Sequence, residues 1–219
     1  MATSTSSPDR RATDRRAARV AVAGALFLAV VVLTVFVHGL TGLDTGVREW
    51  MIERRNGGWT DAMKVVSTIG SAWVLTPVAV VVTLVLALRG PRSDALLVGL
   101  VTLGVLVLGP LLKLIIERPR PVDDRLVLVD SWAYPSGHSL TSMAVVGVLT
   151  VLAVRHLRAR PARVAAVVVG AALVAAVGLS RVYLGVHWPT DVLAGWLMGA
   201  MWLAVWLILL DSRRARLAA

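Results

Sequence analysis

The chain has 219 residues, of which 57% are hydrophobic, and it carries a formal net charge of +10. It contains no cysteine, which excludes disulfides, thiolate metal sites and phosphatases with a cysteine nucleophile. The cationic residues gather in the segments that connect apolar runs, a distribution that indicates a membrane protein and argues against nucleic-acid binding.

Six apolar runs without Asp, Glu, Lys or Arg follow one another along the chain. Each is about long enough to cross a hydrocarbon core of about 30 Å as a helix, the structure in which a lipid-exposed backbone satisfies its own hydrogen bonds. We therefore expect an all-α fold class, a polytopic membrane protein with six transmembrane helices in one bundle. The runs are 20–43, 65–88, 95–112, 131–154, 164–180 and 192–210.

The segments between the runs differ in charge. Arginines outnumber acidic residues in the N-terminal tail, in the even-numbered connections and after the last run, whereas the odd-numbered connections are nearly balanced. Because Lys- and Arg-rich loops stay in the cytoplasm, we expect both termini inside and the odd-numbered connections outside. The expected regions are a disordered, Arg-rich cytoplasmic tail at 1–19, a membrane domain at 20–210 and a basic cytoplasmic tail at 211–219.

The longest outer connection, residues 42–71, contains a short amphipathic pattern. Leu43, Val47, Trp50 and Met51 repeat at helical spacing, and charged residues lie between them. This pattern is typical of a helix that lies in the membrane interface, and equally of a helical linker without a role in ligand binding.

Three clusters of polar residues lie at the outer ends of the apolar runs, at 113–121, 134–138 and 180–191. Each cluster alone has an ordinary interpretation. A lysine at a membrane edge extends toward water, Pro and Ser start helices, and an acidic residue complements a helix N-terminus. Their occurrence together on one side of the membrane indicates a shared site.

Together the clusters supply the groups that phosphoryl transfer needs without a metal. A helix start that contains Ser and Gly offers N–H groups to a phosphate, and cationic side chains neutralise the oxygens of the transition state. One histidine can attack phosphorus and the other can protonate the leaving oxygen. Asp191, four residues after His187, can orient that imidazole from the first turn of a helix.

These clusters resemble, in the same order, the three signature motifs of the type 2 phosphatidic acid phosphatase (PAP2) superfamily. The resemblance implies a helical bundle shared with vanadium-dependent haloperoxidases, and phosphatases that use no metal or other cofactor. The matching patterns are Lys113-x6-Arg120-Pro121, Pro135-Ser136-Gly137-His138 and Ser180-Arg181-x5-His187-x3-Asp191.

The resemblance also implies a role for each motif residue. His187 matches the nucleophile that forms a phosphohistidine, Asp191 matches the residue that orients it, and His138 matches the general acid that later activates water. The residues that would hold the phosphate are Lys113, Arg120, Ser136, Gly137 and Arg181.

The implied substrate is a lipid phosphate that stays in the membrane. We expect metal-independent hydrolysis of a phosphate monoester or diphosphate, of the polyprenyl diphosphate or phosphatidate type, at the outer face of the cytoplasmic membrane. The motifs leave open transfer of the phosphate to an alcohol acceptor and hydrolysis of a polyprenyl-linked sugar phosphate. We expect no nucleic-acid partner, and the sequence indicates no particular oligomeric state.

The remaining histidines and a group of acidic residues give weaker signals. His38 and His156 lie outside the motifs, and His156 falls in an inner connection. The spacing of Asp123, Asp124 and Asp130 matches no calcium or two-metal site, so we expect them in a solvated loop.

Overall fold

The computed structural model describes residues 8–217, and residues 1–7 and 218–219 lie outside the described part of the chain. Every regular element in the described part is helical, which confirms the predicted all-α fold class. The elements are α1 (Pro8–Phe36), the 3-10 helix η1 (Val37–Leu40), α2 (Thr41–Glu53), α3 (Gly57–Ile69), α4 (Ala72–Arg89), α5 (Arg92–Ile116), α6 (Gly137–His156), α7 (Arg160–Tyr183) and α8 (Pro189–Leu217).

Six of these helices contain stretches long and apolar enough to cross a membrane, as the six apolar runs predicted. The stretches are Ala17–Phe36 of α1, the whole of α4, α5, α6 and α7, and Pro189–Leu210 of α8. Large apolar side chains such as Leu28, Val81 and Leu103 are exposed on them. An exposed apolar surface of this extent suits helices that face lipid tails.

Two of the predicted runs are interrupted by irregular backbone. The run 65–88 is divided at Gly70, where α3 has ended and α4 starts two residues later. A Cβ atom at Gly70 would lie 2.2 Å from the Val177 side chain, so the glycine lets α7 approach this break. In the run 131–154 helix α6 starts only at Gly137, because Pro135 keeps the backbone before Gly137 extended.

Helix α1 begins before the apolar run that was expected to form it. Residues 8–19, which we expected to belong to a disordered tail, are helical and continuous with the first span. Pro8 suits the first turn of a helix, and the Ala and Arg residues that follow are good helix formers. Residues 1–7 of that tail, and 218–219 of the C-terminal tail, lie outside the described residues.

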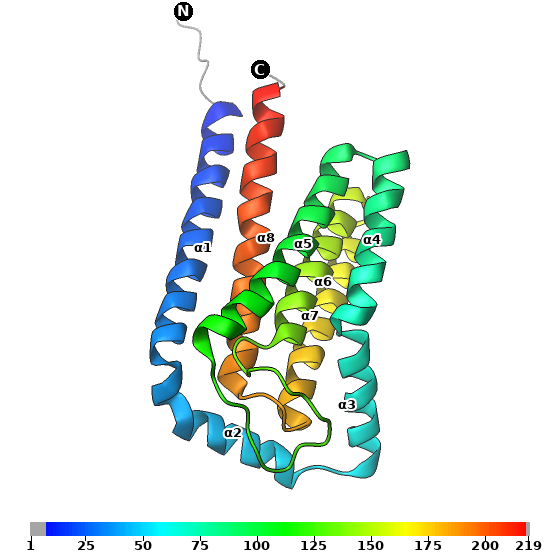
Figure 1. Cartoon of the computed structure of the whole chain (residues 1–219). Coiled ribbons are helices and arrows are strands. Elements are labelled where there is room, and N and C mark those ends of the chain that lie inside the picture. The colour runs from blue at the N-terminus through cyan, green and yellow to red at the C-terminus, as the bar shows by residue number, and fades with distance from the viewer. Residues whose placement is uncertain (1–7, 218–219) are drawn as a thin grey trace, which may run out of the picture.

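Figure 1 shows the start of α1 and the end of α8 at one end of the bundle, and the long connection between α5 and α6 at the other. The connection between α7 and α8 also lies at this second end, and α2 runs across it. We call this the loop end, which comprises residues 41–56, 117–136 and 184–188. All three motif clusters therefore lie at or next to the loop end.

Helices α6 and α8 approach each other at two glycines that are one turn apart. A Cβ atom at Gly195 would lie 2.7 Å from the Ser136 carbonyl oxygen, and one at Gly199 would lie 2.8 Å from the Leu140 carbonyl oxygen. Small residues four positions apart allow two membrane helices to pack closely. Because Ser136 and Asp191 lie at the starts of these helices, this contact brings the second and third motifs together.

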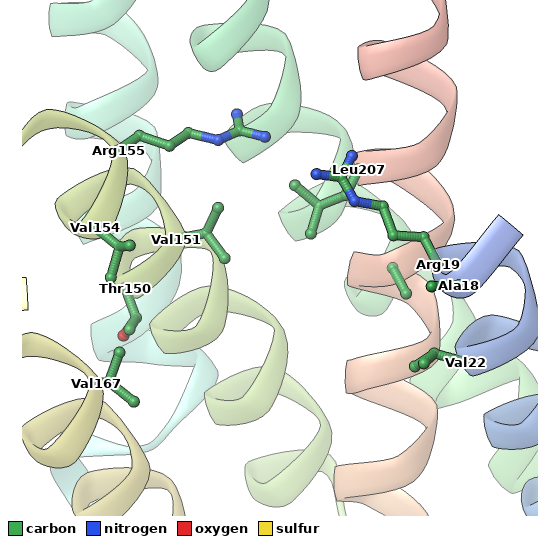
Figure 2. A pocket seen from close by; sticks show the side chains of 10 residues that line it. Ala18, Arg19, Val22, Thr150, Val151, Val154, Arg155, Val167 and Leu207 are labelled. Carbon is green, nitrogen blue, oxygen red and sulfur yellow. The ribbon is translucent and has the colours of Figure 1, made fainter. Parts of the chain in front are cut away.

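A cavity of about 630 Å³ lies between α1, α6, α7 and α8, toward the end that holds the start of α1. Its walls are mainly Ala, Val and Leu side chains, while Arg19 and Arg155 point toward one another across it (Figure 2). No motif residue lines this cavity. The cavity is therefore separate from the residues that the sequence predicted to share a site.

Candidate active site

The three motifs meet at the loop end, and most of their residues lie at helix termini. Lys113 lies in the last turn of α5, and Arg181 lies in the last turn of α7. His138 lies in the first turn of α6, Asp191 lies in the first turn of α8, and His187 lies in the connection before α8. Residues that are far apart in the sequence are thus brought into one cluster.

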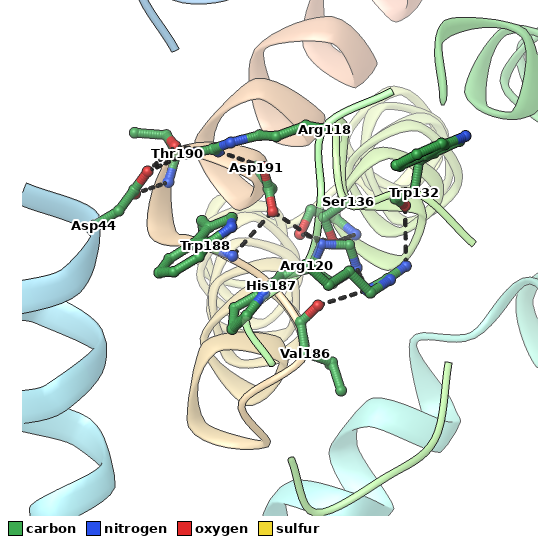
Figure 3. Close-up of polar contacts among 12 residues, drawn as sticks. Asp44, Arg118, Arg120, Trp132, Ser136, Val186, His187, Trp188, Thr190 and Asp191 are labelled. Carbon is green, nitrogen blue, oxygen red and sulfur yellow. Dashed lines mark hydrogen bonds and ion pairs between the residues drawn. The ribbon is translucent and has the colours of Figure 1, made fainter. Parts of the chain in front are cut away.

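His187 and Asp191 lie at the centre of this cluster (Figure 3). The Nδ1 atom of His187 is 3.3 Å from the Oδ2 atom of Asp191. The same carboxylate oxygen accepts a 2.9 Å hydrogen bond from the backbone N–H of Trp188, which fixes the carboxylate in place. Both side chains are buried, so water does not compete for these contacts.

Arg120 faces the other nitrogen of the His187 imidazole. Its Nη1 atom lies 2.9 Å from Nε2, and its Nη2 atom donates a 3.1 Å hydrogen bond to the Trp132 carbonyl oxygen. Because a guanidinium can only donate, we assign the acceptor role to Nε2 and the ring proton to Nδ1. The lone pair of Nε2 therefore faces the cations of the site, and Nδ1–H faces Asp191.

The surroundings of His187 keep its imidazole neutral. Burial lowers the pKa of His187 well below the ordinary value of 6.5, and the charges of Arg120, Lys113 and Arg181 lower this pKa further. Burial also lowers the pKa of Arg120 to about 10, which leaves its guanidinium charged at neutral pH. A neutral imidazole beside several cations can attack the phosphorus of an anionic group that those cations attract.

The start of α6 forms another wall of the site. The Ser136 Oγ atom accepts a 3.1 Å hydrogen bond from the Ser139 hydroxyl, and the Ser136 backbone N–H donates to the Asp191 carbonyl oxygen at 3.0 Å. A Cβ atom at Gly137 would meet nothing within 4 Å, so the space beside this residue is open. Backbone N–H groups of a helix start that face open space can receive a phosphate.

Lys113, Arg181 and His138 complete the cluster. The Lys113 ammonium donates to the Trp132 carbonyl oxygen, and Nη1 of Arg181 donates to the Ser67 hydroxyl. The Nε atom of Arg181 is buried and has no hydrogen-bond partner among residues 8–217. His138 is half-buried and lies within electrostatic range of Arg181.

Two charged residues that the sequence analysis did not place in the site contact it directly. Arg118 lies between Asp44 of α2 and Asp191 of α8, and its guanidinium is 2.6 Å from a carboxylate oxygen of each. Charges in an amphipathic segment or a proline-rich loop usually face water, so neither residue was predicted here. The available signal was that Asp44 directly follows an apolar run, where a charge is often paired with another.

The weaker candidates lie away from this cluster. His156 ends α6 at the opposite end of the bundle, where its Nε2 atom is 3.0 Å from an aspartate of α5. The side chain of His38 is outside the side chains that the structure describes. The three acidic residues of the α5–α6 connection are exposed, as expected for a solvated loop, and they are Asp123, Asp124 and Asp130.

The protonation of His187 gives a direct test of this geometry. Because the folded-state pKa lies below the ordinary value, we expect the His187 imidazole to stay neutral as the pH falls from 8 to 6.5. The measurement is the ¹⁵N chemical shift of its ring nitrogens in detergent micelles, assigned by comparison with His187→Asn. The shifts should also identify Nδ1 as the protonated nitrogen.

A matched variant tests the cause of the shift. Arg120→Gln removes the cation that is 2.9 Å from Nε2, so the titration midpoint of His187 should rise toward that of an ordinary histidine. A wild-type midpoint at or above 6.5 would contradict the assignment of a neutral nucleophile.

Comparison with known proteins supports one family. Residues 94–215 match the PAP2 superfamily. The chain is 32% identical over 179 residues to phosphatidylglycerophosphatase B of Bacillus subtilis (strain 168), and the aligned region covers 80% of this chain and 88% of that protein. It is 30% identical over 156 residues to an undecaprenyl-diphosphatase of Sulfolobus acidocaldarius, and that aligned region covers 68% of this chain and 69% of that protein.

Solved structures agree with this result. The crystal structure of a transmembrane PAP2-type phosphatidylglycerolphosphate phosphatase from Bacillus subtilis superposes with a TM-score of 0.78 at 28% identity, over 89% of this chain and 96% of that one. The structure of Aquifex aeolicus LpxE superposes with a TM-score of 0.60 at 21% identity, over 75% and 94%, and supports the fold alone. From the motifs, the fold and these relatives together, the chain belongs to the PAP2 superfamily and is a multi-pass membrane phosphatase.

Proposed function

We propose that this phosphatase hydrolyses a lipid phosphate monoester or diphosphate through a phosphohistidine on His187, at the outer face of the membrane and without a metal. The observation that carries the proposal is the position of the His187 imidazole. Its Nε2 atom faces Arg120, and its Nδ1 atom faces the buried Asp191 carboxylate. A neutral nucleophile is thus held between a cationic phosphate site and an anion that stabilises the product of its attack.

The first chemical step transfers the phosphoryl group to the enzyme. Nε2 of His187 forms a bond to phosphorus as the bond between phosphorus and the lipid oxygen breaks. His138 gives its proton to that leaving oxygen. The imidazole becomes cationic in this step, and the Asp191 carboxylate accepts its Nδ1–H and offsets the new charge.

The second step releases the phosphate. His138, now neutral, removes a proton from a water molecule, and that water attacks phosphorus as the bond to Nε2 breaks. Inorganic phosphate leaves, and His187 returns to its neutral form. Lys113, Arg120 and Arg181 neutralise the equatorial oxygens in both transition states, which is the charge that a metal supplies in other phosphatases.

Similarity to the two relatives supports a lipid substrate. One is named a phosphatidylglycerophosphatase and the other an undecaprenyl-diphosphatase, and both names describe phosphates on membrane lipids. The site also lies beside helix ends, where the phosphate of a lipid can enter while its chain stays among the spans. Polyprenyl diphosphate and phosphatidate-type lipids, including phosphatidylglycerol phosphate, are the substrates we propose.

Replacing each histidine tests the two roles. His187→Ala should abolish phosphate release in excess EDTA from lipid phosphates and from p-nitrophenyl phosphate, because no other group forms the covalent intermediate. His138→Ala should lower kcat on the lipid by about 10²- to 10⁴-fold, and much less on p-nitrophenyl phosphate, whose leaving group needs little protonation. His156→Ala, at the opposite end of the bundle, is the matched control and should keep full activity. Equal losses on both substrates for His138→Ala would rule out its role as the acid.

Chain length tests the lipid assignment. Each methylene kept from water is worth about 0.8 kcal/mol, so kcat/KM should rise with chain length through a lower KM until the chain fills its groove. The measurement uses a homologous series of phosphatidates or polyprenyl phosphates in mixed micelles at a fixed surface fraction. Equal efficiency on glycerol phosphate would defeat the lipid assignment and leave the phosphatase assignment standing.

Thiol labelling tests the side of the membrane. The proposed orientation rests on the excess of arginines in the tail and in the even-numbered connections. The chain contains no cysteine, so a single introduced thiol reports without background. In intact cells, Asp130→Cys in the α5–α6 connection should react with an impermeant reagent, whereas Ala159→Cys between α6 and α7 should not. The reverse pattern would place the site on the cytoplasmic side.

A further inference from the structure

Three charged side chains form a buried ion-pair network behind the nucleophile. Asp44 and Asp191 are completely buried, and Arg118 between them is 4% exposed. One guanidinium nitrogen of Arg118 is 2.6 Å from Oδ2 of Asp44, and the other is 2.6 Å from Oδ1 of Asp191. The second oxygen of Asp191 is the one that faces His187.

Thr190 connects the same groups a second time. Its hydroxyl donates to Oδ2 of Asp44 at 2.6 Å and accepts from Nη1 of Arg118 at 2.8 Å, and its backbone N–H donates to Oδ1 of Asp44 at 2.9 Å. Figure 3 shows Asp44 and Arg118 meeting beside Thr190 at the start of α8. Asp44 is therefore bound directly to the first turn of the helix that carries Asp191.

Arg118 does not take part in holding the phosphate. Its Nη1 donates to Thr190 and Asp191, and its Nη2 donates to Asp44 and to the Val37 carbonyl oxygen. These acceptors all belong to the protein, in contrast to Arg120, whose Nη1 faces the nucleophile. Arg118 and Arg120 are two residues apart in the loop but serve different sides of His187.

The net charge of this ion-pair network matters for the reaction. When Nε2 bonds to phosphorus, the imidazole gains a positive charge that needs an anion at Nδ1. A pair formed only by Arg118 and Asp191 would be neutral, and Asp191 would then offer little to that charge. With Asp44 on the far side of the guanidinium, one cation lies between two carboxylates. The ion-pair network therefore keeps one net negative charge behind His187.

We propose that Asp44 and Arg118 are positioning residues for phosphoryl transfer. They hold Asp191 in place and keep the ion-pair network behind His187 at one net negative charge. The proposal rests on the phosphohistidine mechanism proposed above. It adds Arg118, which occupies a variable position of the first motif, and Asp44, which lies outside the three motifs and outside the segment 94–215 that matches the family.

Single and double substitutions separate this role from a purely structural one. Asp44→Asn keeps the size of the side chain and removes its charge, and Glu49→Gln makes the same change at an exposed position of the same helix. Asp44→Asn should lower kcat by about 10- to 100-fold, by analogy with the outer partners that orient metal-bound histidines, whose loss has an effect of this size. KM and inhibition by vanadate should stay close to wild type, because the phosphate site is intact. Glu49→Gln should match wild type throughout.

The double variant Asp44→Asn with Arg118→Gln provides the decisive comparison. It removes one anion and one cation, so the net charge behind His187 returns to that of the wild type. We expect the double variant to have a higher kcat than Asp44→Asn alone, a coupling between neighbours that a double-mutant cycle measures. Thermal unfolding of each variant in detergent verifies that the fold is retained.

The outcomes distinguish the two proposals. If wild-type protein releases phosphate and depends on His187, but Asp44→Asn keeps the wild-type kcat, the positioning role is wrong and the mechanism stands. A double variant that is no better than Asp44→Asn also overturns the role of net charge. If the wild-type protein releases no phosphate from any lipid, or keeps its activity without His187, the proposed function itself fails.

Discussion

The close contact between α6 and α8 is the constraint on which the site depends. Gly195 and Gly199 of α8 lie against backbone atoms of the first turns of α6, so neither position has room for a larger side chain. This contact places Ser136 beside the start of α8, where its N–H reaches the Asp191 carbonyl oxygen. The two helix starts therefore share one end of the bundle, where the space beside Gly137 is open.

A cluster of cations in a buried site requires anions in fixed places. Lys113, Arg120 and Arg181 each contact a carbonyl oxygen or a hydroxyl, which are neutral acceptors, so their charges remain available to a phosphate. The carboxylates are on the other side of His187, where Asp191 and Asp44 pair with Arg118. The imidazole separates a region that attracts anions from a region that stabilises cations, and this separation suits a nucleophile that becomes charged as it reacts.

The sequence predicted the spans and the motif cluster well, because both follow from local patterns. Apolar runs of sufficient length are helices in lipid, and the motif spacings are short enough to be read along the chain. Features that depend on distant contacts were not predictable. The break at Gly70 exists because Val177 packs there, and Asp44 is buried because the loop before α6 brings Arg118 to it. The helical conformation of 8–19 also differed from the expected disorder.

The position of Asp44 has a consequence for the modularity of this fold. Helix α2 exposes Leu43 and Trp50 and would be classified as a surface element, yet its Asp44 is bonded to the helix that carries Asp191. On the mechanism proposed above, the functional unit therefore extends beyond residues 94–215, the segment that carries the motifs. Exchange of that segment alone between related proteins would separate the motifs from a partner that lies outside residues 94–215.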